Sequence, residues 1–174
     1  QAAARQMIRQ NEGGAIVNLR GKMELYNSVL KNNGTSVGSG GAIYNGATST
    51  MLIDNTLLEG NKAARAGGAI YNEVGSGLLE LRNGTKLLNN SAAEHGGGIY
   101  NAGTLKISSD SQISSNTANT SGSTFVGGGI FNAGTFTDTS QEVLNQVVTT
   151  NQPDNVFTPP PPLRAFYQRL YQSR

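Results

Sequence analysis

The sequence predicts an all-β protein, a parallel β-helix of about five turns, and two observations carry this prediction. First, a glycine-rich phrase recurs five times, and its isoleucines are Ile16, Ile43, Ile70, Ile99 and Ile130. The steps between them are 27, 27, 29 and 31 residues, and a steady period of roughly 20 to 50 residues is typical of stacked repeat proteins. Second, short runs between the phrases alternate apolar and polar residues, which is the period of a half-buried strand.

Each repeat has room for about three short strands. An alternating run such as Leu79-Glu80-Leu81 follows the glycine phrase. An aliphatic residue, two variable residues and an asparagine come next, as in Leu30/Asn33, Leu58/Asn61, Leu87/Asn90 and Ile113/Asn116. Such a repeat closes as one turn of a β-helix that stacks on its neighbours at ~4.8 Å. Leucine-rich repeats have a similar period but require a strict leucine frame and a helical return, which this sequence lacks.

The period also predicts columns of equivalent side chains. The isoleucines should stack inside the helix, and the residues that follow them should point outward as an exposed aromatic stack: Tyr44, Tyr71, Tyr100 and Phe131, after Val17. The next positions are Asn18, Asn45, Asn72, Asn101 and Asn132. We expect their amides to hydrogen-bond along the axis, since identical stacked amides stabilise such arrays. The paired glycines should lie where the chain turns sharply or another backbone passes closely.

Composition excludes several function classes. The 174 residues carry a net charge of +2, and 14% of them are charged, so overall charge gives no reason to expect a nucleic-acid partner. No run reaches the ~18 apolar residues that a membrane span requires. The absence of cysteine excludes disulfides and thiolate metal sites. The chain begins at Gln1 rather than methionine, which fits a removed signal peptide, another processed start or a partial sequence equally well. The polar composition favours an exported protein.

Catalytic chemistry finds little support in the residues. Many β-helix proteins act on polysaccharides, and their sites require clustered carboxylates. Here the acids are scattered, and Asp54 and Asp110 lie two turns apart, roughly 10 Å by the stacking distance. His95 is the only histidine, and a lone histidine supports neither a triad nor a zinc site. We therefore predict no catalytic residue, metal ligand or cofactor, and expect a non-enzymatic protein.

The repeats occupy residues 13–140, and the ends should differ from them because an open β-helix exposes unpaired strand edges. Residues 1–12 predict an N-terminal cap, either a short amphipathic helix or an extra strand. Residues 141–158 are more apolar than the repeats and predict a closing strand or loop. Open prism ends would also allow end-to-end stacking or homo-oligomers.

The last segment is the best functional clue. Prolines 159–162 predict an extended rod without ladder donors, which would hold residues 163–174 away from the β-helix. Those residues predict an amphipathic helix with Leu163, Phe166, Tyr167, Leu170 and Tyr171 on one face, accompanied by Arg164 and Arg169. A helix of this length is marginal alone. It either binds a partner with aromatic and arginine anchors or folds back on its own β-helix.

The two motifs together resemble the repeats of polymorphic outer membrane proteins, which pair GGAI with FxxN. Residues 13–16, 40–43, 67–70, 96–99 and 127–130 match the first motif, and the aliphatic-x-x-Asn pairs match the second with an aliphatic residue in place of phenylalanine. The resemblance covers roughly residues 13–157. It implies a right-handed, pectin-lyase-like β-helix at the surface of a bacterium, often in an adhesin or autotransporter passenger.

Three functions remain as hypotheses. The preferred one is a structural or scaffolding subunit that docks with protein partners in a larger assembly through its terminal segments. The alternative is a surface adhesin or passenger fragment that binds protein or glycan along the aromatic stack. A carbohydrate-active enzyme is the least favoured.

Overall fold

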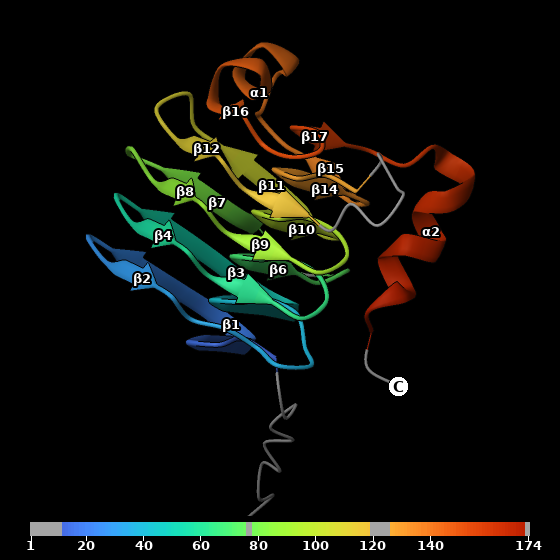
Figure 1. Cartoon of the computed structure of the whole chain (residues 1–174), viewed down its shortest axis with the longest axis horizontal. Coiled ribbons are helices and arrows are strands. Elements are labelled where there is room, and N and C mark those ends of the chain that lie inside the picture. The colour runs from blue at the N-terminus through green and yellow to red at the C-terminus, as the bar shows by residue number, and fades with distance from the viewer. Residues whose placement is uncertain (1–11, 76–77, 119–125, 173–174) are drawn as a thin grey trace, which may run out of the picture.

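The computed structural model describes residues 12–75, 78–118 and 126–172 of the chain. They form a parallel β-solenoid of about five turns with two short helices (Figure 1). The strands are β1 (Ile16–Tyr26), β2 (Val29–Lys31), β3 (Ile43–Asp54), β4 (Leu57–Glu59), β5 (Lys62–Ala63), β6 (Ile70–Asn72), β7 (Leu78–Arg82), β8 (Lys86–Leu88), β9 (Ser91–Ala92), β10 (Ile99–Asn101), β11 (Thr104–Ile107), β12 (Gln112–Ser114), β13 (Thr117–Ala118), β14 (Ile130–Asn132), β15 (Thr135–Phe136), β16 (Val148–Thr149) and β17 (Val156–Phe157). The helices are α1 (Gln141–Val147) and α2 (Pro161–Leu170).

Parallel strand pairs connect each turn to the next on every face of the solenoid. The glycine phrases supply one face, where β3, β6, β10, β14 and β17 lie side by side. In β1 and β3 the strand continues round the bend onto the second face, which β7, β11 and β15 extend. Strands β2, β4, β8, β12 and β16 form the third face, and β5, β9 and β13 form a short ladder beside it. The predicted parallel solenoid is therefore confirmed.

The core of the solenoid holds the predicted isoleucine column. Ile16 pairs with Ile43, and the register continues through Ile70, Ile99 and Ile130 to Val156. From Ile43 to Ile130 these isoleucine side chains are wholly buried. The leucines, isoleucines and methionines of the other two faces pack against them in a single cluster. Burial of one aliphatic side chain stabilises a fold by about 1.5–3 kcal/mol, so each buried isoleucine of the column contributes to the stability of the solenoid.

The paired glycines are required by the geometry of stacking. Gly96 has a φ of +66°, which L-amino acids with side chains rarely adopt. A Cβ atom on Gly97 would lie 2.3 Å from the carbonyl oxygen of Gly128 in the next turn. Both predicted reasons for these glycines, a sharp turn and a close backbone approach, are confirmed.

Two columns of asparagines run along the solenoid. In the predicted column, Nδ2 of each asparagine donates to Oδ1 of the next from Asn18 to Asn132, over 2.7–3.0 Å. A second column joins the asparagines of the aliphatic-x-x-Asn motif, Asn33, Asn61, Asn90 and Asn116, and ends at Asn151. These amides satisfy one another's hydrogen bonds inside the protein, where an unpaired polar group would cost about 1–3 kcal/mol.

Helix α1 closes the C-terminal end of the solenoid, where a closing strand or loop was predicted. The Ser140 hydroxyl caps α1 by accepting from the amide of Val143 at 3.2 Å. Leu144 and Val147 are buried against the core cluster. Strands β16 and β17 then continue two of the faces, so the end is covered by a helix and two short strands. The predicted N-terminal cap, apart from Glu12, lies outside the described residues.

The predicted proline rod is replaced by the start of a helix. Pro161 and Pro162 are the first two residues of α2, and Pro160 precedes it. Proline suits the first turn of a helix because its φ is already helical and the missing N–H would have no partner there. The helix therefore begins before the predicted residue 163, and it ends at Leu170.

Candidate functional site

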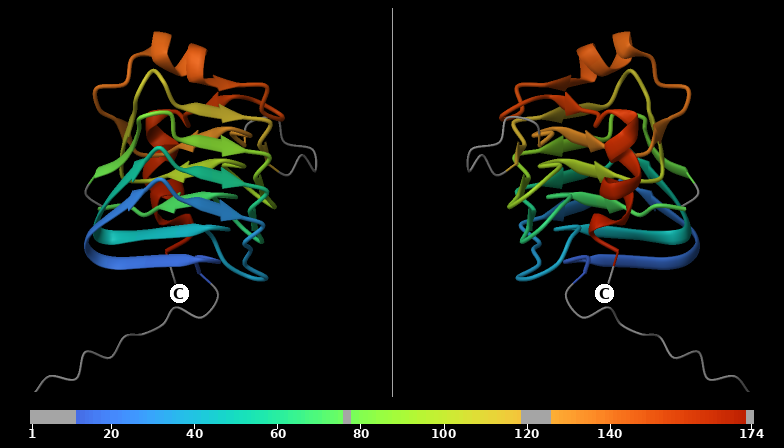
Figure 2. Two further views of the ribbon diagram at one scale, coloured as in Figure 1. Left: turned by 90° about the vertical axis from the view of Figure 1, so that its left-hand side faces the viewer. Right: turned by 90° about the vertical axis from the view of Figure 1, so that its right-hand side faces the viewer.

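Helix α2 lies along the outside of the glycine-phrase face and runs from the last turn back toward earlier ones (Figure 2). Tyr171, at its end, is 1% exposed. The Tyr171 ring packs edge-on against Tyr100 with centroids 5.0 Å apart, and against Tyr71 at 6.2 Å. One helical turn earlier, the Tyr167 ring packs edge-on against Phe131 at 5.0 Å. The fold-back of this segment, one of its two predicted interpretations, is thus what the structure shows.

The outward aromatic residues stack as predicted. Successive rings of Tyr44, Tyr71, Tyr100 and Phe131 have centroids 5.1–5.2 Å apart and planes within 12° of parallel. Their predicted exposure is wrong, because all four side chains are 0% exposed. They form an outer cluster with Tyr167 and Leu170 of α2 and with Tyr171, which follows the helix. Alternation along a strand correctly predicts which way a ring points, but it cannot predict that another segment covers it.

Polar contacts fix the position of α2. The Tyr171 hydroxyl lies 2.5 Å from Nδ1 of His95, and the Tyr100 hydroxyl donates to the carbonyl oxygen of Tyr167. Nε2 of Gln168 donates to the carbonyl oxygen of Ala133 at 2.9 Å. The guanidinium of Arg65 lies over the Tyr171 ring, 4.8 Å from its centroid, a geometry in which a cation is attracted to the ring.

Burial changes the pKa values of three groups at the contact between α2 and the solenoid. Desolvation lowers the pKa of His95, although the Glu94 carboxylate acts in the opposite direction. Desolvation also raises the pKa values of the Tyr100 and Tyr171 hydroxyls, since each would have to carry a negative charge away from water. The docked helix is therefore compatible with neutral rings, and a charge on any of them opposes docking.

The predicted partner-binding residues divide into two groups. Tyr167, Leu170 and Tyr171 pack into the outer cluster. Leu163 and Phe166 remain 47% and 59% exposed, and Arg169 is exposed as well. Arg164 turns toward the last turn of the solenoid, where its Nε donates to the carbonyl oxygen of Pro159 at 3.0 Å.

Three residues that hold α2 were missed by the sequence analysis. His95 was considered only as a catalytic or zinc-binding residue, and Arg65 and Gln168 were not considered. His95 and Arg65 stand just before glycine phrases, in the loops that flank the aromatic column. Their proximity in sequence to the stack is a signal for contact with whatever covers it, although it does not identify α2.

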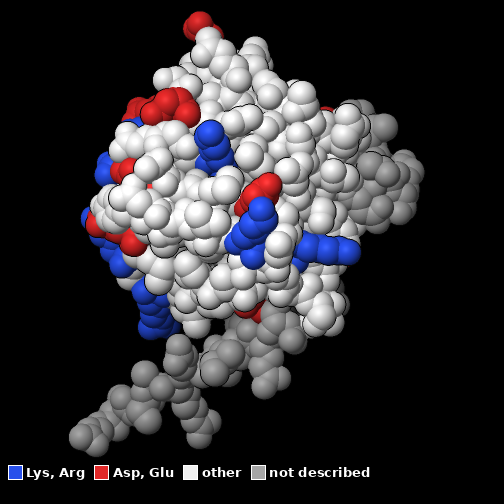
Figure 3. Space-filling model, turned by 60° about the vertical axis from the view of Figure 1, so that its left-hand side comes forward, with Lys and Arg blue, Asp and Glu red and all other residues white. Residues whose placement is uncertain are grey.

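Most of the face in Figure 3 is uncharged, and the charged side chains on it are of both signs. Several carboxylates face cations in the next turn. Nε of Arg82 lies 2.7 Å from Oδ2 of Asp54, and Nζ of Lys31 lies 2.9 Å from Oε2 of Glu59. Exposed pairs of this kind contribute about 0–1 kcal/mol each, so they help the turns to stack in register without dominating stability.

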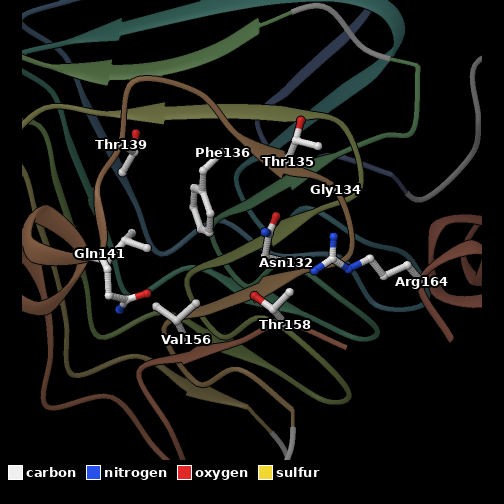
Figure 4. Close-up of a pocket in the computed structure, with 10 residues that line it drawn as sticks. Asn132, Gly134, Thr135, Phe136, Thr139, Gln141, Val156, Thr158 and Arg164 are labelled. Atoms are coloured by element: carbon white, nitrogen blue, oxygen red, sulfur yellow. The ribbon is translucent and has the colours of Figure 1, made fainter. Parts of the chain in front are cut away.

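A hollow opens where the last turn, α1 and α2 meet (Figure 4). Its volume is about 340 Å³, and it is lined by uncharged polar side chains, by the apolar side chains of Phe136, Leu144 and Val156, and by Arg164. A second hollow of about 380 Å³ adjoins it along α1 and shares Gln141, Leu144 and Val156.

The described residues contain no group of three or more His, Asp or Glu side chains that could hold a metal ion. Neither α1 nor α2, the helices in the described part of the chain, has the length and apolar character that crossing a membrane requires.

Comparison with known proteins identifies the repeat. Residues 55–73 and 85–102 match the family model of the Chlamydia polymorphic membrane protein (Chlamydia_PMP) repeat. Each matched segment runs from an aliphatic-x-x-Asn motif into a glycine phrase, so the resemblance expected from these motifs is confirmed. The matched repeat is that of a family of membrane- or surface-associated proteins, and it covers well under half of this chain. No curated protein and no solved structure gave a match.

Proposed function

We propose that this chain is a non-enzymatic structural module of a bacterial surface protein, and that the outer side of α2 docks with a protein partner. The observation that carries the proposal is the division of α2 into an anchored side and an exposed apolar side. Tyr167, Leu170 and Tyr171 hold the helix against the solenoid, while Leu163 and Phe166 face outward.

The anchored side makes α2 rigid before any partner arrives. A helix of ten residues is marginal in isolation, and here aromatic packing and the hydrogen bonds to His95 and Ala133 hold it in place. Docking to a preformed helix avoids the entropy cost of ordering a flexible tail on binding. The solenoid thus acts as a scaffold for a helical recognition surface.

The exposed side has the composition of an interface. Phe166 and Leu163 stand one helical turn apart and therefore lie on the same side of α2. They are two of six large apolar side chains that are exposed among the described residues. Exposed Arg169 lies one turn beyond Phe166, and aromatic and arginine side chains are enriched where proteins bind one another.

The arrangement of the carboxylates supports a non-enzymatic role. Glycosidases place two carboxyl groups on either side of the scissile bond. Asp54 is instead engaged by Arg82 and by Nδ2 of Asn83, which donates to it over 2.7 Å. The residues described as lining the two hollows include no aspartate or glutamate.

The bacterial-surface part of the proposal rests on the polymorphic membrane protein repeat. The same resemblance favours a right-handed, pectin-lyase-like solenoid, which agrees with the general right-handedness of parallel crossovers. Glycan or protein binding along the aromatic stack loses support because α2 covers the stack. End-to-end stacking is not part of the proposal, since α1 covers the C-terminal end of the core.

The proposal can be tested with two matched double variants of the full chain. Leu163→Ser with Phe166→Ser alters α2, and Val29→Ser with Val37→Ser alters equally exposed valines elsewhere, 65% and 57% exposed. Each protein would be immobilised and used to capture partners from the surface fraction of the bacterium. A crosslinker introduced at Phe166 would then identify the protein that touches it. We expect the wild type and the valine variant to retain the same partner and the α2 variant to lose it.

Equal capture by both double variants would place the interface elsewhere and contradict the proposal. The non-enzymatic part has its own assay, in which the purified chain is incubated with a panel of acidic and neutral polysaccharides. We expect no new reducing or unsaturated ends, and their release would show an enzyme.

A further inference from the structure

The 340 Å³ hollow at the last turn lies within the size range of small-molecule binding sites, about 300–1,000 Å³. The last turn, α1 and α2 meet around it. The last turn contributes Asn132, Thr135 and Phe136, α1 contributes Gln141, and Arg164 reaches it from α2 (Figure 4). Such convergence of a few polar groups in a concave site is typical of a ligand pocket.

Asn132 ends its asparagine column with an unused donor. Its Oδ1 accepts from Nδ2 of Asn101 at 2.7 Å, but the described residues include no acceptor for its own Nδ2. A sixth turn with the same repeat would place another asparagine beside Asn132. The register of β14 with β17 puts Thr158 there instead. Asn132 as a whole is only 4% exposed, and it lines the hollow, so its free donor is open to the hollow.

The direction of the hydrogen bonds in this column is fixed by backbone carbonyl groups. Nδ2 of Asn72 and Nδ2 of Asn101 also lie within hydrogen-bond distance of the carbonyl oxygens of Thr104 and Thr135. An amide oxygen could not donate there, so the nitrogens are assigned by the network. The column therefore ends on an NH₂ group, which requires an acceptor.

Arg164 supplies a positive charge at the same place. Its side chain extends from α2 toward Asn132 and Thr158 (Figure 4). Among the described residues, no carboxylate forms an ion pair with it, and only its Nε is engaged, by the carbonyl oxygen of Pro159. A guanidinium fork together with the free amide donor of Asn132 favours a carboxylate, which accepts from both.

We propose that this hollow binds a carboxylate-bearing sugar, with the carboxylate at Arg164 and Asn132 and the hydroxyl groups at the neighbouring side chains. Thr135, Gln141 and Thr158 offer the neutral donors and acceptors that sugar hydroxyls require. The ring of Phe136 offers an apolar surface for a sugar face. The adjoining hollow of about 380 Å³, lined by Asn145 and Asn155 among others, has room for a second sugar unit. This site is separate from the exposed side of α2 and does not depend on a protein partner.

The experiment is a titration of the full chain with methyl glucuronide, followed by calorimetry and by the side-chain amide signal of Asn132 in NMR spectra. Methyl glucoside has the same ring without the carboxylate, and acetate and a short peptide carry a carboxylate without the ring. Arg164→Gln removes the charge at the hollow. Arg169→Gln removes the same charge from an exposed position of the same helix and is the matched control.

We expect the wild type and Arg169→Gln to bind methyl glucuronide with equal affinity and to shift the Asn132 amide signal. Arg164→Gln should bind at least about tenfold more weakly, as the loss of a charged hydrogen bond predicts. Thr158→Val, which removes one hydroxyl but keeps the shape, should weaken binding less. Hydrogen exchange of α2 would verify that it stays docked in each variant.

Equal binding by Arg164→Gln and Arg169→Gln would overturn the proposal, as would an unchanged Asn132 signal at saturation. Equal affinity for acetate or the peptide would show a general carboxylate site and overturn its assignment to a sugar. Failure of the wild type to bind methyl glucuronide would overturn it as well.

Discussion

Neighbouring residues of the same strands are buried in two different ways. Ile99 points into the solenoid and Tyr100 points out of it, and both are 0% exposed. The isoleucine is enclosed by its own turn and by the turns above and below it. The tyrosine is covered by α2, which lies more than sixty residues further along the chain. The inner column therefore stays buried for as long as the solenoid exists, whereas the outer column loses its cover when one helix detaches.

The largest effect should come from placing a charge in the inner column. Ile99→Asp buries a carboxylate among aliphatic side chains, and the cost of desolvating it exceeds several kcal/mol. We expect the solenoid to lose its β-structure, measured by circular dichroism. Val17→Asp makes the same change at the outward position of the first turn, where the side chain is 38% exposed, and should leave the spectrum intact. Retention of the fold in Ile99→Asp would contradict an enclosed inner column.

The next largest effect should be a loss of α2 docking that uncovers the outer column and leaves the inner column buried. Tyr171→Ala removes the buried anchor of α2 and should weaken its docking by about 3 kcal/mol, as for other buried aromatic residues. Hydrogen exchange should accelerate in α2 and not in the amides of β6 and β10. Phe166→Ala in the same helix removes a side chain that is 59% exposed and should change exchange little. Equal acceleration in the solenoid strands would show that α2 and the core unfold as one unit.

Breaking an asparagine column should cost less, because only polar contacts are lost. Asn72→Ala leaves the Nδ2 group of Asn45 without an acceptor and removes the donor to Asn101. We expect a loss of about 1–3 kcal/mol in the free energy of unfolding by urea. Asn145→Ala at an exposed position of α1 should cost under about 0.5 kcal/mol. If Asn72→Ala lowers the free energy of unfolding no more than Asn145→Ala does, the amide hydrogen bonds of the column do not stabilise the fold.

The smallest effect should be a pH dependence confined to the outer column. Burial beneath α2 lowers the pKa of His95 from its ordinary value of 6.5. Below pH 6.5, His95 therefore binds a proton more readily when α2 is undocked than when it is docked. Docking of α2 weakens as the pH falls. The Glu94 carboxylate moderates this effect, and the facing Tyr100 and Tyr171 hydroxyls, whose pKa values burial raises, are neutral in this range.

Hydrogen exchange of α2 at pH 7.5 and pH 5, corrected for intrinsic rates, measures this dependence. His95→Gln cannot titrate and should show no weakening beyond that correction. A pH dependence that persists in His95→Gln would assign it to another group.

The asparagine columns show how far sequence reasoning reaches. The repeat predicted hydrogen-bonded amides at the asparagine that follows each outward residue, and the structure confirms them from Asn18 to Asn132. In contrast, the prediction for the aromatic residues failed on exposure although it succeeded on stacking. Four consecutive prolines predicted a spacer because they favour an extended chain. Proline also fits the first turn of a helix, and Pro161 and Pro162 lie inside α2.

By itself, the sequence determined the repeating part of this protein. Stacked turns place equivalent residues next to one another, so a period read along the chain becomes a contact in space, and the inner isoleucines, the glycines and the amides follow from it. Only the tertiary structure decided what lies outside the repeat. The cover of α2 over the aromatic column, the closure by α1 and the hollow between Asn132 and Arg164 each join segments that share no period. Their contacts depend on shape and burial over long sequence separations, which no local pattern records.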